Sequence, residues 1–495
     1  MARISPLWFL LPVQAVLLFW NPGLLPVWTD ELFTLGIAPR PLGEIVARLA
    51  KDIHPPLYYF QLHLVSLAAG ASVEWFRAVS AAWALGLTAL MDRLWVKDWA
   101  PAQRWVALSL VAFSPCLLLY GRMARSYSMQ AALALLAVWA MRRWLEAPSG
   151  GWRKAAAAAL AAAALLYAHY VPGLAILGGF AVAGVRRAGW IRWGVFMVSV
   201  LALYAPWLWV LAHALSRWGA APDFSSRYML TGSFLLEHLL KLGFGWTSLA
   251  IGESFPAASL ALAALLLAVL VLGLGRAGAL SGAAGMPVCA AALLGYIAVS
   301  RWVSYPFTPA RLLWLLPFLA IAWTAGLSAL RPPAARWTLF AAVILSHAVS
   351  AGFYFERRGF LNPGYSAPLR EITARINAAA GRDDLVLMDG YNTDHAAVAH
   401  YLRPDVARAV VNAANEREVL ARSDAARDVW VVRNARDISP GGVSSRAEEA
   451  VCRGREASTE LWHPLPGWQR LALRLLSIPG SYSHFYRVTS CRAPG

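Results

Sequence analysis

Two adjacent carboxylates stand in residues 27–59, a stretch that follows an apolar start and precedes hundreds of mostly apolar residues. Asp30 and Glu31 are neighbours, so their side chains diverge. One of them can face a substrate while the other faces a metal ion or a basic partner. Carboxylates near a bilayer are costly and are usually paired or functional. The pair also fits the N-terminal cap of a helix, and the residue types alone leave both interpretations open.

Asp52 and His54 form a second pair of ionisable residues in this stretch, in the sequence "DIHPPLYY". The proline pair that follows, Pro55 and Pro56, stiffens the chain and favours the start of a helix. We therefore expect Asp52 and His54 to lie at the mouth of that helix. An ordinary junction between a loop and a helix is the structural alternative.

Arginines recur in two later segments. In "YGRMARSYSMQ", Arg122 and Arg125 are three residues apart, a spacing that places two side chains on one helical face. Their expected partner is an anion, either the nearby acids in a structural salt bridge or a phosphate group. In "RWVSYPFTPARLLW", Arg311 is expected to hold a lipid phosphate at headgroup level with Tyr305 nearby, or to anchor the helix by snorkelling.

Histidines elsewhere give weaker signals. Glu237 and His238 are adjacent and suit a divalent metal, but two ligands fall short of a complete site. His169 and Tyr170 stand at the end of an apolar run, where a single histidine more often packs than binds. A metal ion therefore remains an open alternative, and no other cofactor is indicated.

The composition indicates a polytopic membrane protein. Of 495 residues, 59% are hydrophobic and only 14% are charged, whereas soluble domains carry roughly a quarter charged residues. Apolar runs recur from Leu7 to Tyr354, many of them near the ~20 residues that a spanning helix needs. We predict about eleven transmembrane helices, near residues 7–25, 75–95, 104–121, 128–145, 153–170, 171–187, 191–212, 256–275, 284–303, 311–330 and 336–355.

The distribution of charge predicts the orientation. The net charge of +17 lies mostly in the first 355 residues, which hold 25 basic and 11 acidic residues. With the N-terminus in the cytoplasm, the basic turns fall on the cytoplasmic side, as the positive-inside rule expects. Residues 26–74, 213–255 and 356–495 then lie outside the cytoplasm. Because the positive-inside rule accounts for the excess of positive charge in these loops, the charge does not indicate a nucleic-acid partner. The segment after His54 is too short to span and is expected to lie along the outer surface.

The last 140 residues differ in character from the rest. Segments such as "DLVLMD", "DVWVVRN" and "SHFYRVTS" read as strands between helical segments. The chain therefore divides into a transmembrane domain, 1–355, and a small α/β domain, 356–495. The expected fold class is an all-α polytopic membrane bundle with this extracytoplasmic domain attached. Cys452 and Cys491 would be able to pair there if the domain is outside the cytoplasm.

Taken together, these motifs resemble those of the GT-C glycosyltransferases, in particular the bacterial relatives of protein O-mannosyltransferases and of the lipid A aminoarabinose transferase. The resemblance is carried by "DE" after the first helix, "DIHPPLYY", the pattern R-x-x-R-x-Y that ends at Tyr127, and "PARLLWLLPFL". It covers most of residues 1–355 and weakens through 190–300. Some relatives have lysine where this chain has His54, and Arg311 comes one residue later than in the commoner pattern.

The resemblance implies a membrane enzyme that transfers a sugar from a polyprenyl-phosphate donor to a hydroxyl group of a lipid, protein or glycan acceptor. Asp30 would be the general base, and Glu31 and Asp52 would shape an acidic pocket or help to hold a metal. The substrate-binding candidates are Glu31, Asp52, His54, Arg122, Arg125, Tyr127, Tyr305 and Arg311. A single base with direct attack predicts inversion at the anomeric carbon.

Two alternatives follow from the same features. A lipid-linked polysaccharide polymerase or ligase would share the donor class, and a polyprenyl-lipid transporter would do no chemistry. A transporter is expected to carry charges near the bilayer midplane and often repeated halves, whereas the acids here gather at one face. The expected location is the cytoplasmic (inner) membrane, in contact with membrane lipids.

Overall fold

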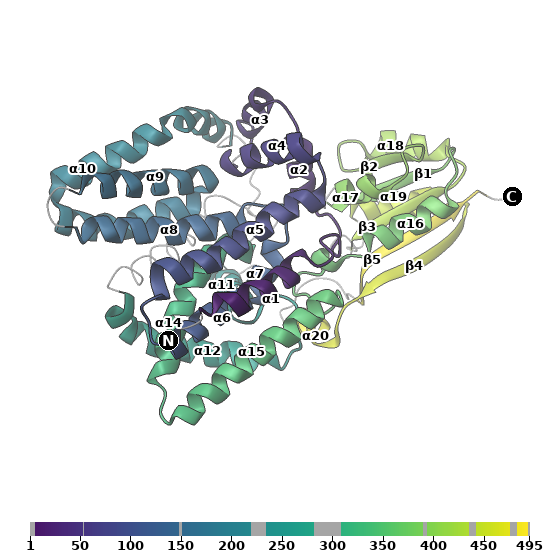
Figure 1. Cartoon of the computed structure of the whole chain (residues 1–495). Coiled ribbons are helices and arrows are strands. Elements are labelled where there is room, and N and C mark those ends of the chain that lie inside the picture. The colour runs from purple at the N-terminus through teal and green to yellow at the C-terminus, as the bar shows by residue number, and fades with distance from the viewer. Residues whose placement is uncertain are drawn as a thin grey trace. The chain divides into compact units, whose positions relative to one another are not determined.

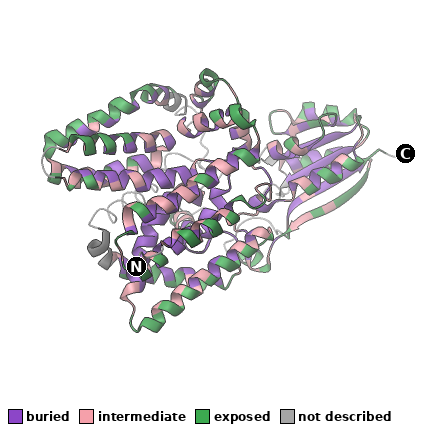
Figure 2. Cartoon of the chain, viewed as in Figure 1, coloured by how far each residue is buried: buried purple, intermediate pink, exposed green. Residues whose placement is uncertain are grey.

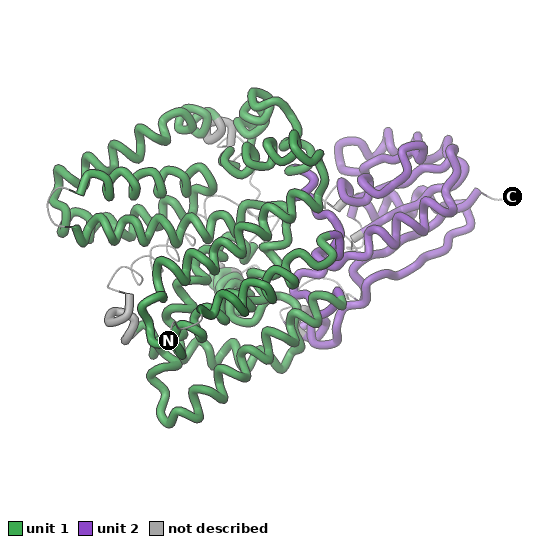
Figure 3. The backbone as a smooth tube through the Cα atoms, in the orientation of Figure 1, with its two compact units in different colours: residues 1–22, 34–356 green, residues 23–33, 357–495 purple. Residues whose placement is uncertain are grey.

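The chain divides into two compact units in a computed structural model (Figures 1 and 3). The first unit comprises residues 1–22 and 34–356, and the second comprises residues 23–33 and 357–495. The second unit thus includes a short segment from the N-terminal part of the chain as well as the C-terminal domain. The structure describes residues 5–52, 54–147, 151–218, 234–281, 308–389, 394–434, 442–475 and 483–493.

The first unit is built of helices, as its composition predicts. Its described helices are α1 (Leu7–Phe19), α3 (Leu42–Leu49), α4 (Leu57–Ala69), α5 (Val73–Met91), the π-helix η1 (Asp92–Val96), α6 (Pro101–Ala112), α7 (Pro115–Gly121), α8 (Tyr127–Leu145), α9 (Trp152–Ala168), α10 (Tyr170–Trp218), α11 (Phe234–Ile251), α12 (Ser259–Ser281), the 3₁₀ helix η3 (Pro309–Leu315), α14 (Leu316–Ala329) and α15 (Pro333–Phe355). Helix α2 (Thr29–Ile37) runs across the boundary between the units.

Three helical segments in the described part of the chain are long and apolar enough to cross a membrane: Tyr170–His213, Pro309–Ala329 and Pro333–Phe355. The pair α6 and α7 becomes a fourth if it is counted as one span bent by 44°. Helices α1, α4 and Ser259–Leu274 are apolar but shorter. The count of eleven spans therefore stays a prediction, and its span 284–303 lies outside the described residues.

Two interruptions of the helical chain lie at residues that favour them. Helix α10 is interrupted at Gly189, whose φ of 79° is accessible to glycine at little cost. This break falls between the predicted spans 171–187 and 191–212. Between α6 and α7 the chain passes through Ser114 and Pro115, and the Ser114 hydroxyl accepts a hydrogen bond from the Leu117 N–H at the start of α7.

The helices of the first unit differ in how deeply they are buried (Figure 2). Helix α8 is buried on nearly all sides, the pattern of a helix at the centre of a bundle. Helices α10 and α15 keep many large apolar side chains exposed, as is expected of surfaces that face lipid. Helices α12 and α14 approach closely at Gly273 and Gly326. A Cβ atom on either glycine would lie about 2 Å from a carbonyl oxygen of the other helix.

The second unit is an α/β domain, which confirms the small C-terminal sheet expected from the sequence. Its elements after residue 357 are η4 (Pro363–Ser366), α16 (Leu369–Ala379), β1 (Leu385–Asp389), α17 (Asp394–Tyr401), β2 (Ala407–Val411), α18 (Glu416–Asp424), β3 (Val429–Asn434), α19 (Val443–Cys452), β4 (Glu456–Pro464), α20 (Gly467–Leu475) and β5 (His484–Arg492). The strand order is β2-β1-β3-β5-β4. Strands β2, β1 and β3 are parallel, and β5 joins β3 and β4 antiparallel.

Helices cover both faces of this sheet. Val386 and Met388 pack with residues of α16 and α17, whereas Leu385 and Leu387 pack with residues of α18 and α19. The alternation follows from the two-residue period of a strand. Because both faces are buried, β1 is apolar along most of its length, as is typical of a central parallel strand. The disulfide Cys452–Cys491 joins the end of α19 to β5.

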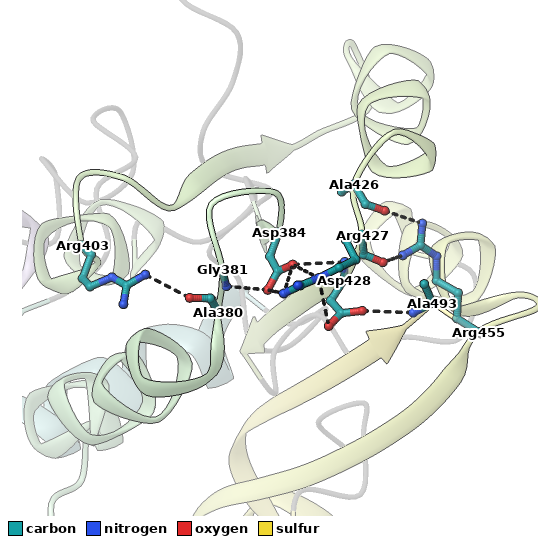
Figure 4. Close-up of polar contacts among 9 residues, drawn as sticks. All are labelled: Ala380, Gly381, Asp384, Arg403, Ala426, Arg427, Asp428, Arg455 and Ala493. Carbon is teal, nitrogen blue, oxygen red and sulfur yellow. Dashed lines mark hydrogen bonds and ion pairs between the residues drawn. The ribbon is translucent and has the colours of Figure 1, made fainter. Parts of the chain in front are cut away.

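A polar network lies at the end of the sheet where strands β1 and β3 begin (Figure 4). The buried Asp384 carboxylate accepts hydrogen bonds from the Gly381 N–H and from the Arg427 guanidinium. Asp428 accepts a hydrogen bond from the Ala493 N–H, directly after β5, at the same end of the sheet. Arg455 donates to the carbonyls of Ala426 and Arg427. All of these hydrogen bonds satisfy polar groups at the ends of loops and strands, so the network stabilises the domain.

Candidate functional site

Asp30 and Glu31 lie in the first turn of α2, where the helix dipole stabilises negative charge. Glu31 is fully buried, and Asp30 is half-buried. The Glu31 carboxylate lies 3.5 Å from the Trp28 N–H, the position in which a glutamate reaches back to the start of its own helix. The two side chains therefore differ in environment, as expected of neighbours. Glu31 takes part in capping, and Asp30 is the more accessible carboxylate.

Asp52, His54 and Arg125 follow one another in a row of polar contacts in the first unit. Asp52 Oδ1 lies 3.2 Å from His54 Nδ1, and an amino group of Arg125 lies 2.6 Å from His54 Nε2. Asp52 and His54 precede α4, which begins directly after Pro56, as the proline pair predicts. A guanidinium has only donors, so His54 Nε2 is the acceptor and the ring proton is on Nδ1. The imidazole is thus neutral in this arrangement.

Further contacts hold Arg125 in place. Its guanidinium donates to the Tyr59 hydroxyl at 3.1 Å and approaches the Thr34 hydroxyl at 3.4 Å. Its backbone carbonyl accepts a hydrogen bond from the Ser80 hydroxyl, which also contacts the Tyr58 hydroxyl at 2.6 Å. Groups from α2, α4 and the segment before α4 thus contact a buried guanidinium. A guanidinium carries several directed donors and can bind an anionic group.

Arg122 lies in a different environment from Arg125. Its guanidinium donates to four carbonyls at the end of α1, those of Leu17, Leu18, Trp20 and Asn21. Its Nε donates to the Tyr354 hydroxyl at 2.9 Å. The last carbonyls of a helix have no partner within the helix, so Arg122 acts as the C-terminal cap of α1. These contacts give Arg122 a structural role and lend no support to its predicted role in binding phosphate.

The expectation that Arg122 and Arg125 share a helical face is wrong. Helix α7 ends at Gly121 and α8 begins at Tyr127, so both arginines lie in the connection between them. The chain turns tightly at this point, with the Arg122 N–H bonded to the Leu119 carbonyl at 3.3 Å. Spacing in the sequence implies a shared face only where a helix continues.

Arg311 and His169 belong to the surroundings of Arg125. Arg311 is half-buried in η3, and His169 lies between α9 and α10. The His169 ring interacts electrostatically with Arg311, His54 and Arg125, which places these groups near one another. The sequence favoured a packing role for His169. Its position beside these side chains was not detectable from a single histidine at the end of a helix.

Tyr127 begins α8 and packs edge-to-face on Tyr120, with ring centroids 5.6 Å apart. The Tyr120 hydroxyl donates a hydrogen bond to Glu253, which also accepts one from the Ser248 hydroxyl at 2.9 Å. Glu253 follows Gly252, whose φ of 90° ends α11 and turns the chain back. Burial raises the pKa of Glu253 to about 7. The sequence alone gives no signal for this glutamate, because its partner Tyr120 lies 133 residues away in the chain.

The remaining candidates lie partly outside the described residues. Tyr305 and the side chain of Glu237 belong to that part, whereas His238 lies in α11. Among the described residues, no group of three or more His, Cys, Asp or Glu side chains is arranged to hold a metal ion. The metal site suggested at Glu237 and His238 stays a prediction.

Comparison with solved structures identifies the fold. Along 99% of both chains, this protein is similar to ArnT from Cupriavidus metallidurans in the apo state, with 13% sequence identity and a TM-score of 0.52. It is also similar to the archaeal oligosaccharyltransferase AglB from Archaeoglobus fulgidus, solved in complex with an inhibitory peptide and a dolichol-phosphate. That likeness has 12% identity and a TM-score of 0.50 over 90% of this chain and 70% of the other. The chain has the GT-C fold. The sequence matches no protein-family model and no curated protein.

Within the GT-C fold of this chain, the described candidates differ in what their environments allow. Arg125 is a buried cation with polar partners from several elements, and a guanidinium can bind an anionic group through its donors. Asp30 is a half-buried carboxylate in the first turn of α2, and such a group can accept a proton.

Proposed function

We propose that this protein is an integral-membrane glycosyltransferase. It moves a sugar from a polyprenyl-phosphate donor to an acceptor hydroxyl on the outer face of the cytoplasmic membrane. The observation that carries the proposal is the buried Arg125, held by His54 and Tyr59 in a chain with the GT-C fold. The dolichol-phosphate named in the AglB complex supports a lipid phosphate as the donor class.

In the proposed mechanism, Arg125 and Arg311 bind the donor phosphate. Their charges stabilise the negative charge that develops on the phosphate as the bond to the anomeric carbon breaks. His54, oriented by Asp52, positions Arg125. Arg122 is left out of the binding set because the end of α1 engages its guanidinium.

Asp30 acts as the general base in this proposal. It takes the proton of the acceptor hydroxyl as the oxygen attacks the anomeric carbon, and the polyprenyl phosphate leaves from the opposite side. Asp30 lies half-buried in the first turn of α2, where a carboxylate can accept a proton. One base with direct attack gives a product of inverted configuration, in contrast to the two-carboxylate retaining mechanism.

The proposed location is the outer side for residues 26–74 and for the C-terminal domain. The disulfide Cys452–Cys491 supports this placement, because disulfides persist in oxidising compartments. A cysteine introduced at the exposed Glu44 should react with a membrane-impermeant maleimide in intact cells. Labelling only after the cells are opened would contradict this orientation.

The decisive experiment compares a deletion strain with strains that carry the wild-type protein, Asp30→Asn or Glu44→Gln. Mass spectrometry of lipids and envelope glycans should show a lost sugar mass and an accumulated prenyl-linked precursor in the deletion and Asp30→Asn strains. Glu44 is an exposed acid paired with Arg40, so its variant serves as the matched control. If the protein were a transporter, the Asp30→Asn strain would keep the sugar mass, because no catalytic base would be lost. This comparison requires that the variant protein is present at the wild-type level.

The purified protein then tests the chemistry. Wild-type protein in lipid vesicles with a prenyl-phosphate-linked sugar should release prenyl phosphate only in the presence of acceptor. NMR of the product reports the anomeric configuration. Retention of configuration would rule out direct attack assisted by a single base.

A further inference from the structure

The segment Gly23–Phe33 belongs to the same compact unit as the C-terminal domain, although more than 320 residues separate them in the sequence. The Val27 N–H, which is buried, donates to the Tyr401 hydroxyl at 2.8 Å. Arg370 donates to the Gly23 carbonyl at 2.6 Å. Leu32 packs against the hydrophobic core formed by α16, α17 and the sheet. The domain therefore holds this segment at its start, its middle and its end.

Arg370 and Tyr401 also contact each other. Arg370 Nε donates to the Tyr401 hydroxyl at 3.2 Å, and the guanidinium carbon lies 5.4 Å from the centre of the tyrosine ring. Arg370 lies in the first turn of α16 and Tyr401 ends α17. The Asn377 side chain joins these helices by donating to the Tyr401 carbonyl at 3.0 Å. Contacts within the domain thus hold Arg370 and Tyr401 in the positions from which they contact the segment.

The aromatic residue that follows Val27 adds a further contact. The Trp28 ring packs edge-to-face on Tyr365, with centroids 5.7 Å apart. Helix α2 begins at the next residue, and its first turn holds Asp30 and Glu31. Since a helix is rigid over one turn, the position of Val27 and Trp28 determines where these two carboxylates lie.

We infer that the C-terminal domain acts as a clamp that positions the first turn of α2 through Tyr401 and Arg370. This inference rests on the proposed function only in that sugar transfer is one of its two readouts. Tyr401 and Arg370 are positioning residues, because they contact the segment and not a substrate. A displacement of about 1 Å at a catalytic group can cost about 10²-fold in rate, so loosening the clamp should lower kcat.

Tyr401→Phe in the full-length protein is the direct test. It keeps the ring under Arg370 but removes the acceptor for the Val27 N–H and the Arg370 Nε. Hydrogen exchange, read by mass spectrometry, should become roughly tenfold faster in peptides that cover residues 23–33. In the transfer assay, kcat should fall by about 10²-fold while KM for the donor changes little.

Matched arginine variants provide the control. Arg370→Lys keeps the charge but cannot make the two directed hydrogen bonds, so it should show a smaller change in the same direction. Arg375 lies on the same helix, half-exposed, and pairs with Glu460. Arg375→Lys should leave both the exchange of residues 23–33 and kcat at wild-type values. Thermal unfolding distinguishes loss of the clamp from unfolding of the domain.

The two readouts separate the clamp from the proposed function. Unchanged exchange in Tyr401→Phe would overturn the clamp. Faster exchange with unchanged kcat in an active enzyme would overturn the positioning role. If the wild-type protein shows no transfer while exchange accelerates in Tyr401→Phe, the proposed function fails and the clamp is supported.

Discussion

Arg125 donates a hydrogen bond to Nε2 of His54 over 2.6 Å, and this contact sets the state of the imidazole. Since arginine has no acceptor, Nε2 must carry a lone pair and Nδ1 the proton. The Asp52 carboxylate lies 3.2 Å from Nδ1 and stabilises that tautomer. His54 in this state positions the cation. His54 and Arg125 are thus held against each other by a directed hydrogen bond.

Arg125→Lys is expected to lower kcat/KM for sugar transfer by about 10²-fold or more, the usual cost of losing a directed donor in an active site. Lysine keeps the charge, but its single ammonium cannot replace a planar guanidinium that contacts His54, Tyr59 and Thr34 together. Steady-state kinetics with a prenyl-phosphate-linked sugar measure the effect. Arg143→Lys, at an exposed position of α8, is the control. Wild-type kinetics in Arg125→Lys would remove Arg125 from the mechanism.

Arg122→Gln is expected to destabilise the protein, because several carbonyls at the end of α1 lose a charged donor. Hydrogen bonds to charged groups contribute about 1.5–3 kcal/mol each, so a loss of about 3 kcal/mol is a low estimate. Thermal unfolding in detergent measures it, with Arg143→Gln as the control. If Arg122→Gln unfolded like the wild-type protein but bound donor poorly, Arg122 would return to the set of phosphate ligands.

Glu253 should make stability depend on pH. Burial raises its pKa to about 7 from 4.5, so the folded state keeps a proton that the unfolded state releases. Stability is therefore full below pH 4.5, falls as the pH rises from 4.5 to 7, and is constant above. The two pKa values correspond to a loss of about 3 kcal/mol. Glu253→Gln should abolish this dependence and make the protein more stable at pH 8.

Unfolding midpoints measured between pH 4 and pH 8 test the Glu253 prediction. Glu74→Gln, at an exposed position in the first turn of α5, controls for the loss of one carboxylate. A variant Glu253→Gln with the same pH dependence as the wild-type protein would show that another group titrates.

His463 should give the C-terminal domain the opposite pH dependence. Burial, reinforced by repulsion from Arg357, lowers the pKa of His463 to about 4 from 6.5. The folded state thus holds a neutral ring, whose Nε2 lies 3.3 Å from the Ser366 hydroxyl. Stability is full above pH 6.5, decreases as the pH falls to 4, and is constant below. The pKa difference sets an upper limit of about 3 kcal/mol.

Hydrogen exchange of β4 and β5 in the full-length protein measures the His463 effect within the domain. His463→Gln should remove the acceleration that the wild-type protein shows between pH 6.5 and pH 4, after correction for intrinsic exchange rates. His484→Gln, at the start of β5, is the control. The same acceleration in His463→Gln would assign the effect to another residue.

Local features of the chain were predictable where a local cause determines them. Pro55 and Pro56 do precede a helix, because a fixed φ favours its first turn. The boundary between the predicted spans 171–187 and 191–212 coincides with the break at Gly189. The strands of the tail form a sheet, since each was recognisable as a short run rich in apolar and β-branched residues.

The candidate site was only partly predictable. Arg122 and Arg125 have the same residue type and similar neighbours, and nothing local distinguishes a helix cap from a buried cation beside His54. Their roles depend on what packs against them, namely the end of α1 in one case and α4 in the other. Glu253 and His169 were not selected for the same reason, because their partners come from distant parts of the chain.

Composition and local pattern were enough to predict the apolar helices, the helix start after the prolines, the α/β character of the tail and the residue types available for chemistry. Each of these depends on interactions between residues close in the chain, or on composition, which local propensity records. The tertiary structure alone decided which arginine faces His54, and that residues 23–33 join the C-terminal domain. Such contacts link residues more than 70 positions apart, and the free energy of packing that selects them leaves no local pattern in the sequence.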